Sequence, residues 1–182
     1  MKTSYKHAIA IMALLFIGGV ASPRQRKNAS GHSPIPKKMI VRVGGGVYYP
    51  MDGGKPEALM RSSYSVELRG KGLHYRVIRK GAEPNVEKVI TPTEEQWESF
   101  WKEVENARLW SWSEDYYNYD VKDGTSWFVE ISCRGRSIKS RGTNSYPSEG
   151  DVSKSNPGAE YSQPFRAVLR GVRNLLGGLE FE

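Results

Sequence analysis

Residues 63–78 read SYSVELRGKGLHYRVI, and residues 125–142 read TSWFVEISCRGRSIKSRG. In both stretches, apolar and polar residues alternate on either side of a short segment that contains glycine. Such alternation places every second side chain on the same face of a strand, and the glycines suit a tight turn. Both stretches are therefore predicted to form β-hairpins.

One register in each hairpin brings compatible side chains together on both faces. The first hairpin pairs Leu68 with Leu73 and Glu67 with His74. The pairs of the second hairpin are Ile131 with Ile138, Glu130 with Lys139, and Phe128 with Arg141. The last pair predicts a cation–π contact. Cys133 alternates in phase with Ile131, so we expect it to be buried and unreactive.

An amphipathic helix is predicted after each hairpin. The first starts at Thr91, Pro92 and Glu94, a cap, a first helical residue and a capping-box glutamate. Its apolar side chains recur at helical spacing: Trp97, Phe100, Trp101, Val104 and Ala107. The second helix opens at Pro164, and its apolar side chains are Phe165, Val168, Leu169, Val172 and Leu176.

These elements predict an α+β fold for residues 38–182, read as a single domain. Short strands at Met39–Val43 and Glu87–Ile90 complete the pattern, and the Ser-, Pro- and Gly-rich residues 147–163 are predicted to be a loop. We expect an antiparallel sheet of two hairpins plus edge strands, with two helices packed on one face in ββαββα order.

The first 21 residues are typical of a signal peptide. Lys2 and Lys6 precede the apolar run Ala8–Val20, and Gly19 and Ala21 fit the small-residue pattern of a cleavage site. We therefore expect a secreted protein, periplasmic or extracellular, that is cleaved near Ala21, with no transmembrane span in the mature chain. An uncleaved anchor is the alternative.

Charge is unevenly distributed along the chain. The whole chain carries +7, but residues 63–182 contain 17 basic and 18 acidic residues. The basic residues 22–37 are predicted to be a flexible linker. A nucleic-acid binder carries its positive charge on the folded surface, so we expect no nucleic-acid partner. The single Cys excludes an internal disulfide.

The motifs of common enzymes and metal sites are missing or incomplete. His32 and His74 are far apart in sequence, so no metal site and no cofactor are predicted. Ser99 and Lys102 match a Ser-x-x-Lys pattern, but its companion motifs are absent. No catalytic residue is assigned, and a non-enzymatic role is favoured. A small hydrolase using Asp120 or Asp123 ranks third among the functions considered.

The segment from Trp110 to Trp127 contains many aromatic rings interleaved with carboxylates and amides. Flat apolar rings beside hydrogen-bonding groups are suited to binding sugars or a protein partner. The candidate ligand-binding residues are Trp112, Tyr116, Tyr117, Asn118, Tyr119 and Asp120. The alternative is that several of these rings belong to the core.

A resemblance to a group of known sequences rests chiefly on two further motifs. Asp123-Gly124-Thr-Ser-Trp127 and Gly142-Thr-Asn144-Ser-Tyr146-Pro147 follow Trp97-x-x-Phe100 and Leu109-Trp110-x-Trp112. Over residues 63–177 the chain resembles a group of uncharacterised exported bacterial proteins, a domain of unknown function. The resemblance implies a bacterial setting and brings no activity with it.

The sequence therefore predicts an exported, non-enzymatic binding or interaction module of the bacterial cell envelope. Its partner is an unknown envelope protein or glycan. The alternative is a carbohydrate- or peptidoglycan-binding domain that uses the aromatic segment Trp112–Tyr119.

Overall fold

The computed structural model of the chain describes residues 35–45, 62–79, 85–118, 120, 124–158 and 160–182. The predicted signal peptide and residues 22–34 of the predicted linker lie outside the described residues. The elements in chain order are β1 (Lys38–Gly45), β2 (Ser63–Arg69), β3 (Gly72–Ile78), β4 (Val86–Ile90), α1 (Glu94–Asn106), the 3-10 helix η1 (Leu109–Ser111), β5 (Asp115–Tyr117), β6 (Thr125–Cys133), β7 (Arg136–Thr143), β8 (Ser145–Pro147), β9 (Ser155–Pro157) and α2 (Gln163–Leu175).

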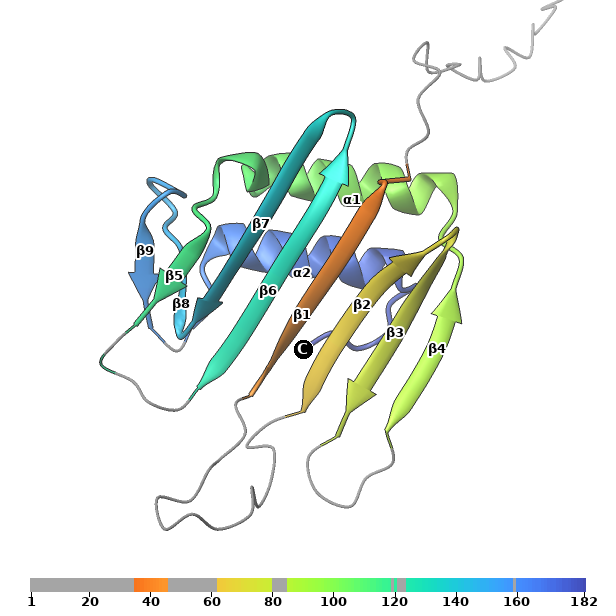
Figure 1. Ribbon diagram of the computed structural model, residues 1–182, viewed down its shortest axis with the longest axis horizontal. Helices are drawn as coiled ribbons and strands as arrows, with labels where there is room; N and C mark the ends of the chain where they lie inside the picture. Colours follow the sequence, from red (N-terminus) through yellow and green to blue (C-terminus); the bar gives the residue numbers. More distant parts are fainter. Residues whose placement is uncertain (1–34, 46–61, 80–84, 119, 121–123, 159) are drawn as a thin grey trace, which may run out of the picture. The chain divides into compact units, whose positions relative to one another are not determined.

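Seven strands form one mixed sheet in the order β4-β3-β2-β1-β6-β7-β5, and β8 pairs with β9 in a second, two-stranded sheet (Figure 1). The sheet is mixed because β5 runs parallel to β7, whereas the other neighbours are antiparallel. The predicted fold, an antiparallel sheet of two hairpins plus edge strands in ββαββα order with two helices packed on one face, is therefore wrong in its sheet and in its order of elements.

The main error concerns β1. This strand lies in the middle of the sheet and joins the two hairpins, because Val41 pairs with Val66 of β2 on one side and with Val129 of β6 on the other. Alternation in a sequence reports which face a side chain occupies, but it carries no information on the neighbours of a strand. The position of β1 therefore could not be read from its pattern.

The second error concerns short strands. Residues 115–117 form β5, and the predicted loop 147–163 contains β9 and ends at the first residue of α2. Three-residue strands of Ser, Asn and Pro have little strand propensity of their own, so tertiary pairing decides their conformation.

Both predicted hairpin registers are confirmed. Leu68 pairs with Leu73 and Glu67 with His74 in the first hairpin. In the second, Ile131 pairs with Ile138 and Glu130 with Lys139. Gly70 and Gly135 have positive φ angles in the two turns, where a glycine is free of the steric cost that a side chain would add.

The helices differ from expectation only at their ends. Helix α1 is capped by Thr93, two residues later than predicted. The Thr93 hydroxyl accepts a hydrogen bond from Gln96 N at 3.3 Å, and the Gln96 side chain accepts one from Thr93 N at 2.8 Å, which completes a capping box. Trp97, Phe100 and Val104 of α1 are buried, as predicted. Gly171 of α2 faces Phe100, where a Cβ would lie 3.0 Å from the ring, so the helices approach closely.

The two faces of the large sheet differ in character. One face carries buried apolar side chains, among them Met39, Val41 and Val129, which share a core with both helices. Figure 1 shows α1 and α2 side by side behind the sheet. No element in the described part of the chain covers the opposite face, which we call the open face.

Candidate functional site: the open face of the sheet

The open face presents rows of side chains that run across the strands. In the central row, the registers align one residue from each of the seven strands. In spatial order the row is Glu87, Arg76, Ser65, Arg42, Phe128, Arg141 and Asp115. Residues directly opposite one another on adjacent strands have neighbouring side chains, so the row is a continuous band of contacts.

Ion pairs occupy the two ends of this row. Arg76 Nε lies 3.0 Å from Glu87 Oε1 at one end, and Arg141 Nε lies 2.5 Å from Asp115 Oδ1 at the other. The hydrogen bond to Asp115 raises the pKa of Arg141. In the middle, the Arg42 guanidinium lies 5.9 Å from the centroid of Phe128, within the range of a cation–π contact.

The predicted cation–π partner of Phe128 is Arg141, its neighbour in the register. The structure instead places the Arg42 guanidinium over the ring and the Arg141 guanidinium on Asp115. A carboxylate is the stronger partner for a guanidinium, so Arg141 is held away from the ring.

Ion pairs also hold the remaining carboxylates of this face. Arg69 Nη2 lies 2.9 Å from Glu67 Oε2, and Lys38 Nζ lies 2.7 Å from Glu130 Oε1. The hydrogen bond from Arg69 lowers the pKa of Glu67, and the charge of Arg42 contributes further.

Two cations of the open face are left over. Arg42 and Lys139 form no ion pair with any carboxylate among the described residues. They lie two strands and one row apart, so their Cα atoms are separated by about 12 Å. The strands of this face thus carry an excess positive charge at two separate places.

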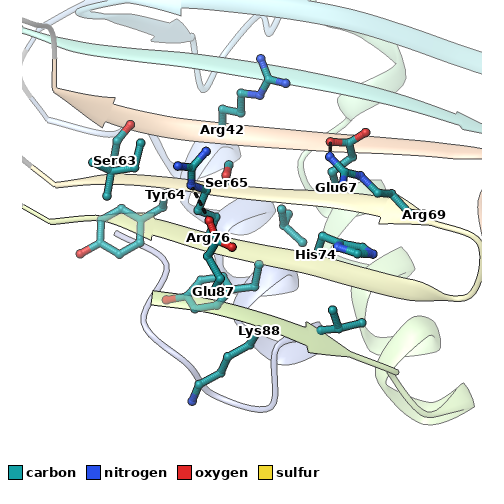
Figure 2. Close-up of a pocket in the computed structure, with 14 residues that line it drawn as sticks. Arg42, Ser63, Tyr64, Ser65, Glu67, Arg69, His74, Arg76, Glu87 and Lys88 are labelled. Carbon is teal, nitrogen blue, oxygen red and sulfur yellow. Dashed lines mark hydrogen bonds and ion pairs between the residues drawn. The ribbon is translucent and has the colours of Figure 1, made fainter. Parts of the chain in front are cut away.

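The face is hollowed over β1–β4. Figure 2 shows this depression, which has a volume of ≈ 610 Å³. The pairs Arg69–Glu67 and Arg76–Glu87 are drawn with dashed lines, and Arg42 stands apart from both on β1. His74 lies between Glu67 and the exposed Val89 in the register.

A second row of the open face is lined by small and hydroxyl-bearing residues. It runs through Ser63, Gly44, Ser126, Thr143 and Tyr117. The hydroxyls of Ser126 and Thr143 lie 3.3 Å apart. Tyr117, with 38% of its surface exposed, ends the row. This row offers hydrogen-bonding groups beside an aromatic ring.

The predicted aromatic segment divides into a buried part and an exposed part. Trp112 and Tyr116 are buried in the core. Trp112 Nε1 donates to Ala107 O at 2.9 Å. The Tyr116 hydroxyl donates to Val152 O and accepts from Ser113 N, and burial raises its pKa. The rings of Trp112 and Tyr116 therefore pack within the core and present no surface to a ligand.

The part outside the core is the exposed Tyr117 and Asp120 with the half-buried Asn118 between them. Tyr117 lies on the open face, and Asn118 Oδ1 accepts from Asp120 N at 3.1 Å in a local turn. Tyr119 lies outside the described residues, as does Asp123. A ligand surface in this segment remains a prediction, and Tyr117 is the residue that connects it to the open face.

The two motifs of the family resemblance pack against each other. Trp127 Nε1 donates to Ser145 O at 2.9 Å, and a Cβ on Gly142 would lie 2.5 Å from that nitrogen. Asn144 Oδ1 accepts from Thr125 N at 2.9 Å, and a Cβ on Gly124 would collide with the Asn144 side chain. Hydrogen bonding and close packing within the fold therefore explain the identity of these residues.

Rings around Trp127 form what we call the aromatic corner: Trp112, Tyr116, Trp127, Tyr146 and Phe165. The centroid of Trp127 lies 4.9 Å from Phe165, 5.6 Å from Tyr116, 5.7 Å from Trp112 and 6.4 Å from Tyr146. Ring contacts at these distances stabilise a core beyond the area that they bury.

The groups considered for metal binding do not converge in the described part of the chain, which excludes His32 and Asp123. Within that part, no three His, Cys, Asp or Glu side chains are grouped to hold a metal ion. Cys133 is buried, as predicted, and burial raises the pKa of its thiol. Among the described residues, neither helix has the length and apolar character that a bilayer crossing requires.

No protein-family model matches the sequence, and no curated protein is significantly similar to it.

Sequence reasoning missed Arg42. Arg42 belongs to the predicted strand Met39–Val43, but it lies close in sequence to the basic linker, and nothing in its local sequence marks it as a binding residue, although it lies in the central strand of the sheet. The alternation of Val41, Arg42 and Val43 is the available signal, because it puts Arg42 on the polar face of a strand whose other face is apolar.

Proposed function

We propose that the protein is an exported, non-enzymatic binding module of the bacterial cell envelope, and that the open face of the sheet contacts its ligand. The proposal of export rests on the sequence of residues 1–21. The proposal of binding rests on the character of the open face. The incomplete catalytic motifs of the sequence favour binding over catalysis.

One observation carries the proposed site. The open face is broad and polar, its carboxylates are each ion-paired, and Arg42 is left at its centre over Phe128. An unpaired guanidinium beside an aromatic ring offers five donors and an apolar surface at the same place. Ligand-binding surfaces commonly combine a few such convergent polar groups with apolar contact area.

A carbohydrate-binding domain is the second candidate, and Tyr117 is the observation that favours it. The ring is exposed and ends the row of hydroxyl-bearing residues on the open face. An aromatic ring beside hydroxyl groups suits the mixed apolar and polar faces of a sugar. The ligand surface would then extend from the depression over β1–β4 to β5.

Site-specific photocrosslinking tests the proposed site while the ligand is still unidentified. A photoreactive phenylalanine is placed at Phe128 on the open face, or at the exposed Lys102 of α1 as a matched control. We expect an envelope-dependent adduct from position 128 and none from position 102. Adducts from position 102, or from neither position, would contradict the proposed site.

Intact-mass analysis of the exported protein tests the localisation separately. We expect a chain that begins near residue 22. Recovery of the soluble protein with Met1 still attached would count against export.

A further inference from the structure

We infer that the ligand of the open face is an acidic glycan, whose anionic groups bind Arg42 and Lys139. This inference rests on the proposed function, since it names the ligand class of the same surface. It follows from three properties of the open face: the position of its excess charge, the distance between its two unpaired cations, and the placement of its hydroxyl groups and rings.

Excess charge gives the first argument. Glu67, Glu87, Glu130 and Asp115 each have a cationic partner on this face. Their partners are held at 2.5–3.0 Å, so a ligand anion would have to compete with a carboxylate to reach them. A ligand anion can reach Arg42 and Lys139 without displacing a carboxylate. A guanidinium pairs with a carboxylate or a phosphate through two parallel hydrogen bonds.

The separation of the two cations gives the second argument. With about 12 Å between their Cα atoms, Arg42 and Lys139 are suited to contact anionic groups on different units of an extended chain. The surface between and beside them is uncharged or paired. A polymer with anionic groups at intervals and neutral polar groups between them matches this pattern of charge.

Hydroxyl groups and rings give the third argument. Ser63, Ser65, Ser126 and Thr143 project from β2, β6 and β7, on both sides of the strand that carries Arg42. Each hydroxyl both donates and accepts, as the hydroxyls of a sugar do. Phe128 and Tyr117 supply flat apolar faces at two positions on the same side of the sheet. Acidic sugars combine carboxylate, hydroxyl and apolar C–H surfaces.

Single-stranded nucleic acid is the competing polymer, because it also combines anionic groups with surfaces that stack on rings. It binds in grooves of continuous positive charge that follow its backbone. Here Glu67 and Glu130 lie one row from Arg42 on the adjoining strands. A phosphate at every unit would meet these carboxylates, whereas a sparsely charged glycan would avoid them.

Titration with two forms of one polysaccharide tests the inference. The probes are partly methyl-esterified polygalacturonate fragments, whose free carboxylates lie at intervals along the chain, and the same fragments with every carboxylate esterified (the esterified fragments). The protein is the exported chain. A charge-assisted contact contributes enough that its loss weakens binding about tenfold or more. We expect the esterified fragments to bind at least that much more weakly. Equal binding of the two forms would overturn the inference.

Variants locate the contact. Arg42→Gln should weaken binding of polygalacturonate about tenfold, and Arg42→Lys should restore part of it. Lys102→Gln removes the same charge from α1 and should have no effect beyond a general salt dependence. Glu67→Gln should strengthen binding, because it frees Arg69 and removes a carboxylate beside Arg42. If Arg42→Gln and Lys102→Gln behave alike, the inference is wrong.

The outcomes separate this inference from the proposed function. Crosslinking at position 128 without binding of polygalacturonate would leave the open face as the binding surface and overturn the acidic glycan. Failure of both experiments would reject both proposals. Tighter binding of a thymidine oligonucleotide, lost in Arg42→Gln, would replace the glycan with a nucleic acid. Melting curves of each variant confirm that the fold is retained.

Discussion

The aromatic corner and the open face contain two different groups of side chains, and they are used in opposite ways. In the corner, Trp127 is buried, its indole nitrogen has a partner, and its ring contacts other rings on several sides. On the open face, Arg42 is exposed, and no carboxylate of the described residues pairs with it.

An abundance of aromatic residues is therefore poor evidence for a binding site in this protein. Trp112, Tyr116 and Trp127 of the corner contact other rings, and their polar atoms are hydrogen-bonded within the fold. A cation left over from an otherwise complete set of ion pairs keeps its capacity to interact. A charged residue that has no ion-pair partner is therefore a better guide to function than a large aromatic residue.

The largest expected effect is in the aromatic corner. Trp127→Ala should destabilise the fold by about 3–5 kcal/mol, since it removes a buried indole and leaves a cavity among four rings. Urea denaturation of the folded protein measures this change. A loss much below that range would show that the corner is less tightly packed than its geometry indicates.

A smaller effect is expected from Tyr116→Phe. The substitution keeps the ring and removes a hydroxyl that donates to Val152 O and accepts from Ser113 N at 2.7 Å. The two backbone groups lose a partner, so we expect a destabilisation of about 1–3 kcal/mol. Unfolding by urea again provides the measurement. An unchanged stability would mean that water replaces the hydroxyl, and that the corner is open to solvent.

The hairpins show how much of this fold could be predicted from sequence. The pairs Leu68 with Leu73 and Ile131 with Ile138 are predicted correctly, because both faces of a hairpin restrict its register and its partners are close in sequence. The pairing of β1 with β6 joins residues far apart in the chain, and no local pattern reports it.

The candidate site is harder to predict than the fold for the same reason. Aromatic residues of the segment Trp112–Tyr119 are neighbours in sequence, so they stand out as a group. Glu87, Arg42 and Asp115 come from separate parts of the chain, and only the sheet aligns them in one row. Tyr117 is the residue that belongs to both the segment and the open face.

Alkaline pH should affect the core more than the open face. Burial raises the pKa of Tyr116, and burial with the hydrogen bond from Tyr64 to Glu180 raises the pKa of Tyr64 to about 12. Because the folded state favours the neutral phenols, their contribution is complete below the ordinary pKa of 10.0 and is lost as the pH rises above it. Stability measured across this range should fall.

Tyr64→Phe provides the control for this prediction. The variant lacks the phenol, so its stability should fall less steeply above pH 10.0 than that of the original protein. Parallel curves for the two proteins would show that Tyr64 does not contribute to the alkaline loss.

The smallest expected effect on stability belongs to Glu67 on the open face. Its pKa is lowered chiefly by the hydrogen bond from Arg69, so the contribution of the pair is present above the ordinary pKa of 4.5 and is lost as the pH falls through the lowered value. Both side chains are exposed, and exposed pairs contribute little. Glu67→Gln should leave the melting temperature at neutral pH nearly unchanged, and a large drop would contradict this.

One NMR titration compares the two regions in a single spectrum. The labelled protein is titrated with the polysaccharide fraction of a bacterial cell envelope, where the ligand is proposed to lie. We predict that the side-chain Nε–H signal of Arg42 and the amide of Phe128 shift, while the indole signals of Trp112 and Trp127 stay in place. Shifts of the two indoles without a response from Arg42 would contradict the central claim, and would assign binding to the aromatic corner.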